Sequence, residues 1–369
     1  MRIVVNDIAA SKTGALAILK DFYEYVKNNE FKHHWIFLTG GDYLEPVGDR
    51  IEVKVLAEVK KSQKNRLMFD LVSGARYISS LNPDVVLSLQ NTLTRGEIYN
   101  GRRRVPEILY VHQPLGFQQI KRFSFFNAEE REYAVYQYLI GSLIDASVKK
   151  ADKVIVQTEW MKEAVAKKTK VSLYKIQKVL PDISDLSSYK ESGKWKNNEF
   201  FFPSGEILYK NHECAIKAAA ILNHRGIHDF KIHFTLKGLS DVTQRTYADE
   251  YNNISWSGRI SREEVIRKYN ETTLIFPSYI ETFGVPLAEA RQMGTYILAS
   301  DTPFCHEVLS GYPNVKFFNP FDENELADLM EKIIKGQLCI VEGDYKSKVD
   351  KKENSYKEIV DIVKRFSND

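Results

Sequence analysis

The stretch over residues 273–299 constrains the fold more than any other part of this sequence. Its apolar run at residues 273–277 is typical of a buried strand, and a second run at residues 296–299 predicts another. Between them a helix is predicted from Pro286, which suits the first helical position, to Gly294, which suits a helix end. Strands joined through a helix run parallel, so this stretch predicts part of a parallel sheet.

The same stretch carries two carboxylates eight positions apart, with Glu281 expected in the loop and Glu289 about one turn into the helix. A helix start offers unpaired N–H groups and a positive dipole end, which suit a phosphate, and Gly284 allows close backbone approach. Carboxylates on either side can accept hydrogen bonds from sugar hydroxyls. The spacing therefore suits a nucleotide sugar. It also suits a plainer arrangement, in which Glu281 is a surface residue and Glu289 only favours the helix dipole.

Strand and helix patterns alternate along the whole chain in two series. This alternation predicts the α/β fold class, with two doubly wound, Rossmann-like domains facing each other across a cleft. Ligands of such folds bind at the carboxyl ends of the strands. The predicted strands are residues 2–5, 35–38, 51–56, 84–89, 107–111, 153–156, 200–202, 231–236, 254–257, 273–277 and 296–299, and the main predicted helices are residues 15–27, 65–81, 125–151, 213–223, 262–270, 286–293, 323–335 and 356–366.

A stretch with Ser and Lys at residues 182–198 predicts the linker between the domains. We expect a first domain over residues 1–182 and a second over residues 183–354, with a C-terminal helix within residues 355–369 returning to the first.

The first 182 residues carry 28 Lys and Arg against 21 Asp and Glu, whereas the remainder carries 24 against 28. The basic first half favours an acidic partner, either phosphorylated or a membrane surface.

Composition excludes several classes of protein. The three cysteines, Cys214, Cys305 and Cys339, are unclustered, which indicates a reducing compartment and no cysteine metal site. No run approaches 18 apolar residues, and the N-terminus enters a strand without a signal-peptide pattern. No D-x-D triad is present to chelate a divalent ion. We therefore expect a cytoplasmic protein with no bound metal, no other cofactor and no nucleic-acid partner.

Two loops of the second domain carry further candidates. Lys210 follows the strand at residues 200–202 and is suited to neutralise a diphosphate, while Gly205 permits a tight loop; a solvated loop lysine is the alternative. Gly258 precedes Arg259 and Ile260, whose backbone groups could read a nucleobase edge, although a plain turn has the same pattern.

Two loops of the first domain are also candidates. His112 ends a strand and is expected to face the cleft, with a satisfied structural histidine as the alternative. The loop before the first helix is not a G-x-G-x-x-G sequence, so it does not indicate NAD binding. It can still bring Thr13 and Gly14 near a phosphate or an acceptor.

Three basic clusters lie at residues 60–61, 102–104 and 119–126, the last mixed with aromatic residues. A solvated face is the common explanation of such clusters. The sharper hypothesis is docking on an anionic membrane surface that holds a lipid-linked acceptor.

With these motifs the chain resembles the family 4 retaining glycosyltransferases of the GT-B fold. The resemblance is strongest over residues 200–334, through F-F-P-S-G-E-I-L-Y-K-N-H, W-S-G-R-I-S-R-E-E-V and F-P-S-Y-I-E-T-F-G-V-P-L-A-E-A-R-Q-M-G. The first half matches more loosely, through H-Q-P at residues 112–114 and the segment at residues 151–162.

The resemblance implies that Glu281 holds hydroxyls of the transferred sugar, Glu289 holds the ribose and Lys210 neutralises the diphosphate. It places His112 beside the sugar and the backbone of Ile260 against the base. The implied catalytic residues are His112, Lys210 and Glu281, and the implied donor-binding residues are Thr13, Gly14, Gly205, Lys210, Arg259, Ile260, Glu281, Thr282, Phe283, Gly284, Val285 and Glu289. Two departures matter: the arginine that members often carry after Gly205 is Glu206 here, and the usual Gly-Gly of the first loop is Thr13-Gly14.

The resemblance leads us to expect a metal-independent, retaining hexosyltransferase, peripheral on the inner face of the plasma membrane. Its donor would be a UDP-, GDP- or dTDP-linked sugar. Its acceptor would be a glycan or a polyprenyl-diphosphate-linked glycan in bacterial O-antigen, capsule or exopolysaccharide synthesis. Two alternatives remain open: a nucleotide-sugar epimerase of the same fold and a non-enzymatic two-domain solute-binding protein.

Overall fold

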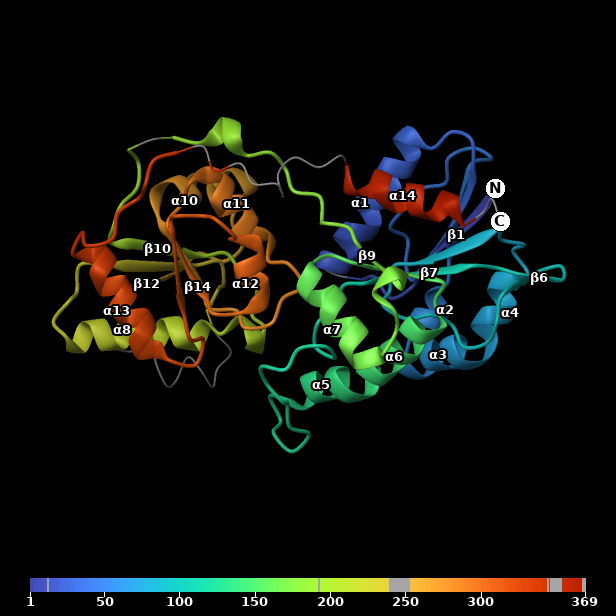
Figure 1. Ribbon diagram of the computed structural model, residues 1–369, viewed down its shortest axis with the longest axis horizontal. Helices are drawn as coiled ribbons and strands as arrows, with labels where there is room; N and C mark the ends of the chain where they lie inside the picture. Colours follow the sequence, from blue (N-terminus) through green and yellow to red (C-terminus); the bar gives the residue numbers. More distant parts are fainter. Residues whose placement is uncertain (12, 192, 239–252, 344, 346–353, 367–369) are drawn as a thin grey trace. The chain divides into compact units, whose positions relative to one another are not determined.

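The computed structural model divides the chain into two compact units (Figure 1). The first unit comprises Met1–Phe126, Arg131–Asp182 and Glu353–Asp369, and the second comprises Asn127–Glu130 and Ile183–Lys352. The structure describes residues 1–11, 13–191, 193–238, 253–343, 345 and 354–366. Each unit is built on its own parallel sheet.

The first unit has a seven-stranded sheet in the order β3-β2-β1-β4-β7-β8-β9. All of its neighbouring strands pair in parallel, and the order reverses between β1 and β4. The register pairs Asn6 with Ser88 and Ser88 with Leu109, so the central strands end at nearly the same level. The strands are β1 (Arg2–Asp7), β2 (His34–Thr39), β3 (Ile51–Val55), β4 (Val85–Ser88), β7 (Glu107–Val111), β8 (Lys153–Val156) and β9 (Ile176–Lys178).

The longer helices cover this sheet because apolar side chains line one stripe of each, as in the first and the C-terminal helix. Helix α14 (Ser355–Arg365) buries Ile359, Val360, Ile362 and Val363 in the core that also contains α1 (Thr13–Asn29). Burying a side chain of this size contributes roughly 1.5–3 kcal/mol, so the C-terminal helix is an integral part of the first unit. The remaining helical segments are α2 (Ala57–Lys60), α3 (Gln63–Met68), η1 (Phe69–Ser73), α4 (Gly74–Ser79), α5 (Arg131–Ala134), η2 (Val135–Ile140), α6 (Gly141–Lys150) and α7 (Glu159–Thr169).

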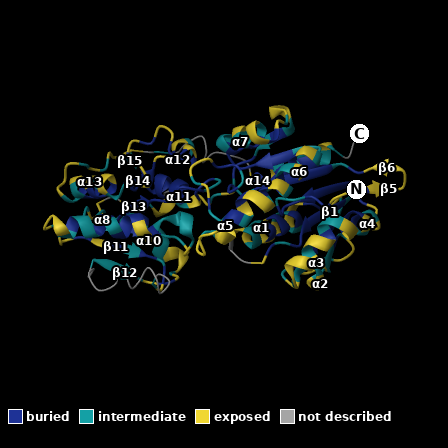
Figure 2. Ribbon diagram, turned by 90° about the horizontal axis from the view of Figure 1, so that it is seen from below, coloured by how far each residue is buried: buried dark blue, intermediate teal, exposed yellow. Residues whose placement is uncertain are grey.

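The second unit has a six-stranded sheet in the order β12-β11-β10-β13-β14-β15, which reverses between β10 and β13. The strands are β10 (Glu199–Phe202), β11 (Lys231–Phe234), β12 (Ile254–Trp256), β13 (Thr273–Phe276), β14 (Ile297–Ser300) and β15 (Val315–Phe318), and the helices are α8 (His212–His224), α10 (Arg262–Glu271), α11 (Val285–Met293), α12 (Pro303–Val308) and α13 (Glu323–Ile334). The central strands and helix α11 are largely buried, while α10 and α13 expose one face to solvent (Figure 2).

The predicted helix over residues 125–151 is wrong at its start, because the helical segments begin only at Arg131. The Asn127 side chain accepts a hydrogen bond from the Glu129 N–H at 3.0 Å, which forms a local turn in place of helix. The short edge strands β9 and β15 were not predicted. Three or four residues give too little periodicity for recognition, and only pairing with a neighbouring strand defines them.

No helix in the part of the chain that the structure describes is long and apolar enough to cross a membrane.

Asp7 ends the central strand β1 and is 1% exposed. Burial raises the pKa of its carboxyl from 3.8 to about 7, although the positive charges of Arg66 and Lys60 oppose the shift. The folded state therefore favours protonated Asp7. The contribution of Asp7 to the free energy of unfolding is fully present below the pKa of the unfolded state. This contribution is lost as the pH rises from about 4 through about 7.

We predict that Asp7→Asn stabilises the protein at pH 8 and changes little at pH 4.5. A shift of about three pKa units corresponds to at most about 4 kcal/mol. Thermal unfolding at both pH values measures the effect, with the exposed Asp49→Asn as the control. Equal changes in Tm at the two pH values would contradict the raised pKa.

Candidate functional site

Lys210 and Glu281 meet at the point where the strand order of the second sheet reverses. Lys210 ends the short helix η5 (Leu208–Lys210), in the segment after β10, and Glu281 follows the adjacent strand β13. The Tyr279 N–H donates to the Tyr209 carbonyl at 3.1 Å, and Lys210 Nζ forms an ion pair with the Glu281 carboxylate. The two side chains are 19% and 16% exposed, so the pair is partly shielded from solvent and still reachable.

Asn211 fixes the segment that carries Lys210. Its φ of 62° is in the left-handed region, which asparagine tolerates better than most residues. Its Nδ2 donates to the Pro320 carbonyl at 2.7 Å and to the Pro277 carbonyl at 3.3 Å. These bonds tie the end of η5 to the segment after β13 and explain why Lys210 lies beside Glu281.

Helix α11 begins beside Glu281, as the sequence predicted. Gly284 precedes it with a φ of 85°, and a Cβ there would approach Leu287 Cδ1 to 3.1 Å. Phe283 anchors the turn with a side chain that is 2% exposed, whereas Val285 is 39% exposed. Thr282 is half-buried between Glu281 and this turn. The positive end of the α11 dipole therefore lies next to the carboxylate of the ion pair.

Glu289 lies in the same helix, and its side chain is 8% exposed. Its Oε1 is 2.7 Å from Arg262 Nη2, and its Oε2 accepts a hydrogen bond from the Tyr269 hydroxyl at 3.0 Å. Two side chains of α10 thus hold the carboxylate, which does more than complement a helix dipole. The sequence analysis did not identify Arg262 and Tyr269 as partners of Glu289. Their spacing of seven residues puts them on one helix face, but no local signal points that face toward Glu289.

The other predicted donor-binding residues of the second unit lie in loops. Gly205 is exposed, and a Cβ there would meet nothing within 4 Å, so the loop itself does not require glycine. Gly258 has a φ of 68°, and its N–H donates to the Leu236 carbonyl at 2.8 Å. Arg259 is exposed and Ile260 half-buried in the segment that follows β12.

His112 follows β7 at the carboxyl edge of the first sheet. Its N–H donates to Asn91 Oδ1 at 2.6 Å, and its Nε2 is 2.9 Å from the Leu89 carbonyl oxygen. Asn91 Nδ2 lies 3.2 Å from the same ring nitrogen, so Nε2 can donate to the Leu89 carbonyl in one tautomer or accept from the Asn91 amide in the other. Burial lowers the pKa of the imidazole, so the ring is neutral at pH 7. The contacts give His112 a fixed orientation.

Thr13 and Gly14 form the first turn of α1 after the loop that follows β1. Gly14 is exposed, and a Cβ there would meet nothing within 4 Å.

Among the described residues, no group of three or more His, Cys, Asp or Glu side chains is arranged to hold a metal ion.

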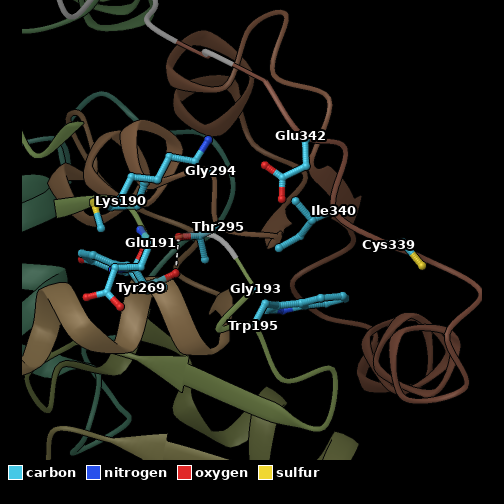
Figure 3. A pocket seen from close by; sticks show the side chains of 12 residues that line it. Lys190, Glu191, Gly193, Trp195, Tyr269, Gly294, Thr295, Cys339, Ile340 and Glu342 are labelled. Atoms are coloured by element: carbon cyan, nitrogen blue, oxygen red, sulfur yellow. Dashed lines mark hydrogen bonds between the residues drawn. The ribbon is translucent and has the colours of Figure 1, made fainter. Parts of the chain in front are cut away.

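A cavity of about 250 Å³ lies elsewhere in the second unit (Figure 3). Its walls include Trp195, whose Nε1 donates to Thr273 Oγ1 at 3.1 Å at the amino end of β13. Tyr269 also lines it, and Figure 3 shows the bond from Thr295 to the Tyr269 carbonyl, 2.7 Å long. None of the donor-binding residues named above lines this cavity, which lies at the opposite end of β13 from Glu281.

Comparison with known proteins finds a matching family model and a similar protein. The model of the family "Glycosyl transferases group 1" matches residues 187–358. The O-antigen chain mannosyltransferase RfbU of Salmonella typhimurium is 27% identical over 199 residues, which are 52% of this chain and 53% of that protein. The chain thus spans about half the length of the curated relative it matches.

Solved structures show the fold. The lipopolysaccharide outer core galactosyltransferase WaaB in its apo form has a TM-score of 0.59 at 16% identity, covering 99% of this chain and 95% of that one. Alr3699/HepE of Anabaena in complex with UDP-glucose has a TM-score of 0.59 at 14% identity, covering 100% and 98%. The prediction of a GT-B fold with two Rossmann-like units is confirmed.

We predict that Asn211→Ala lowers the free energy of unfolding of the second unit by roughly 2–3 kcal/mol. The alanine loses two hydrogen bonds of about 1 kcal/mol each and adds strain of about 1 kcal/mol in the left-handed region. Asn211→Gly keeps that backbone conformation without strain and should cost only about 1–2 kcal/mol. Urea unfolding followed by tryptophan fluorescence measures both variants. Equal losses would exclude the strain, and no loss in either would exclude a structural role of the Asn211 bonds.

Proposed function

We propose that this protein transfers a hexose from a nucleoside diphosphate sugar to a glycan acceptor, because the model of the family "Glycosyl transferases group 1" matches residues 187–358. One observation carries the proposal: Lys210, Glu281 and the amino end of α11 converge at the reversal point of the second sheet. A cation, a carboxylate and the positive end of a helix dipole together match a diphosphate joined to a polyhydroxylated sugar.

The proposed binding mode follows from these charges. The donor diphosphate competes with Glu281 for Lys210 and also accepts hydrogen bonds from the turn formed by Phe283, Gly284 and Val285. Glu281, freed from its cation, accepts hydrogen bonds from hydroxyls of the transferred sugar. The diphosphate thus replaces one anionic partner of Lys210 with another, so the lysine stays compensated throughout.

Glu289 is proposed to bind the ribose, with the base near Arg259 and Ile260. Gly205, Thr13 and Gly14 are proposed to lie along the donor, and His112 beside the sugar as a neutral hydrogen-bonding group. The structure of Alr3699/HepE with UDP-glucose supports a nucleotide sugar as the donor class. The proposed donors are UDP-, GDP- and dTDP-linked sugars.

We propose transfer with retention of the anomeric configuration. The bond between the anomeric carbon and the diphosphate oxygen breaks, and the acceptor oxygen bonds to the same face of that carbon. The acceptor proton passes to the departing diphosphate. The protein would position the reactants and stabilise the charge on the leaving group through Lys210 and the α11 amino end, a contribution that requires no metal ion.

The proposed pathway is the synthesis of a bacterial surface polysaccharide. The likeness to an O-antigen chain mannosyltransferase supports a glycan or a polyprenyl-diphosphate-linked glycan as the acceptor, bound by the first unit. Such an acceptor is held at a membrane, so we also propose a peripheral location on the inner face of the plasma membrane.

We propose that one of the three basic clusters of the first unit forms the surface that docks on the membrane. Of the predicted basic clusters, Lys60 donates to the Ala9 carbonyl, and Arg104 forms ion pairs with Glu97 and with Asp152. These cations are already engaged within the first unit. The docking proposal rests on the third cluster, which forms an aromatic-basic patch with residues of α5 and η2, consisting of Ile120, Lys121, Arg122, Phe125, Phe126, Arg131, Tyr138 and Leu139. Within this patch Arg131 Nε donates to the Phe125 carbonyl at 3.1 Å, and exposed aromatic side chains, rather than unpaired cations, distinguish it.

Apolar side chains of this patch are exposed to an unusual degree. Phe126 is 96% exposed and Leu139 59%, and the rings of Phe125 and Tyr138 contact each other with centroids 5.6 Å apart. Gln137 pins the loop by accepting from the Phe123 N–H at 2.9 Å. Aromatic side chains beside cations suit an interface of acyl chains and anionic headgroups.

Lys210→Ala and Glu281→Ala should each lower the turnover number by two or more orders of magnitude, equivalent to roughly 3 kcal/mol. Matched controls are Lys217→Ala and Glu213→Ala, which remove a solvent-exposed ion pair of α8. The measurement is sugar transfer from UDP-, GDP- and dTDP-sugars to a lipid-linked glycan. Near-normal rates in both site variants would refute the assignment, and donor turnover without acceptor would indicate an epimerase instead.

Replacement of Phe126 and Leu139 by serine should abolish cosedimentation with vesicles that contain anionic lipid. The control is Tyr174→Ser, which removes another aromatic residue of the first unit that is 93% exposed. Unmodified protein should bind anionic vesicles more strongly than neutral ones. Equal binding to both kinds of vesicle, or binding to neither, would exclude this surface.

A further inference from the structure

We infer that Arg262 and Tyr269 are positioning residues that fix the Glu289 carboxylate for the ribose, and that selectivity for ribonucleoside over dideoxyribonucleoside diphosphates depends on them. This inference rests on the proposed function, in which Glu289 binds the ribose. It goes further by assigning roles to two residues outside the motif and by naming the feature of the nucleotide that they select.

Tyr269 holds the inner oxygen of the carboxylate. Its side chain is almost fully buried, and its hydroxyl donates to Glu289 Oε2 at 3.0 Å. Burial raises its pKa well above the ordinary value, so the hydroxyl keeps its proton and remains a donor. The ring packs edge-on against Phe201 at 6.0 Å, and the Tyr269 carbonyl accepts the bond from Thr295 Oγ1. Tyr269 is therefore a rigid support.

Arg262 holds the outer oxygen from the solvent side. It begins α10, where the Ser261 side chain caps the helix by accepting from the Glu264 N–H at 3.2 Å. Its Nη2 is 2.7 Å from Glu289 Oε1, and its side chain is 45% exposed compared with 8% for Glu289. The guanidinium thus reaches inward from a helix start whose position is fixed.

The two contacts leave Glu289 able to accept further hydrogen bonds. A carboxylate has about four acceptor positions, and two of them are occupied. Because Tyr269 is buried and Arg262 borders solvent, the outer oxygen Oε1 is the one that a ribose hydroxyl can approach. With the carboxylate held at both oxygens, this hydroxyl meets an acceptor in a fixed position.

The fixed carboxylate provides the basis of selectivity. A nucleotide without ribose hydroxyls leaves the remaining acceptor positions of a nearly buried charge unfilled, which is costly. A carboxylate that could turn toward solvent would fill those positions with water and discriminate less. Loosening Glu289 should therefore weaken the preference for ribose more than it weakens the contact with the diphosphate.

The test measures binding by calorimetry, with UDP, GDP and their 2′,3′-dideoxy counterparts as probes on the full-length protein. The pair of probes is chosen by the base, uracil or guanine, whose diphosphate binds more tightly. For that pair, the unmodified protein should bind the ribonucleotide about tenfold or more tightly than the dideoxynucleotide. Tyr269→Phe and Arg262→Gln should each reduce this ratio at least threefold, and Arg262→Lys should restore part of it. Lys210→Ala should weaken both nucleotides equally and leave the ratio unchanged.

Matched controls exist in the same unit. Tyr312→Phe removes another buried tyrosine hydroxyl, which donates to the Thr295 carbonyl at 2.6 Å, and Arg267→Gln removes an exposed arginine of α10 that pairs with Glu264. Neither should change the ratio. Arg262 is half exposed, so its variants test the inference even if Tyr269→Phe impairs folding.

The outcomes separate this inference from the proposed function. If the unmodified protein discriminates, and Glu289→Gln abolishes discrimination while the Arg262 and Tyr269 variants retain it, the inference is wrong and the ribose assignment stands. If the unmodified protein does not discriminate, and Glu289→Gln binds UDP and GDP normally, the ribose assignment itself fails and the inference fails with it.

Discussion

The ion pair between Lys210 and Glu281 is the interaction on which the candidate site of the second unit depends. It joins the segments after β10 and β13, the two strands between which the sheet order reverses. Asn211 reinforces the junction by donating to carbonyls on two other segments. A lysine held against a carboxylate is desolvated in part and oriented before any ligand arrives. In the proposed binding mode, a diphosphate would then replace the carboxylate without reorganisation of the loops.

The two carboxylates of the motif differ in how they are held, and the difference suits different tasks. Glu281 has a cation as its partner, which an incoming anion can draw away. Glu289 has a buried hydroxyl and a guanidinium from α10, which a neutral hydroxyl group of a sugar cannot displace. One acid is therefore exchangeable and the other fixed, although both belong to the same turn and helix. The packing of α10 against α11 creates this asymmetry.

The first unit illustrates why a count of charges is a poor guide to a surface. Its sequence carries an excess of basic residues, yet Arg104 and Lys60 are engaged by neighbouring groups of the same unit. Exposed aromatic residues around Phe126 distinguish one cluster from the others. A local turn at Asn127 delays the start of the helical segments and presents that cluster in a loop, which helical periodicity alone did not predict.

The sequence alone determined the class of fold, most strand positions and the strand-loop-helix unit around Glu281, because hydrophobic periodicity and helix-end signals act over a few residues. It also brought Lys210 and Glu281 together as candidates, through a resemblance rather than through spacing. Only the tertiary structure showed that Arg262 and Tyr269 support Glu289 and that Lys60 and Arg104 are already paired. Such contacts depend on how one helix or strand packs on another, and the free energy that fixes this packing is spread over side chains distant in the sequence.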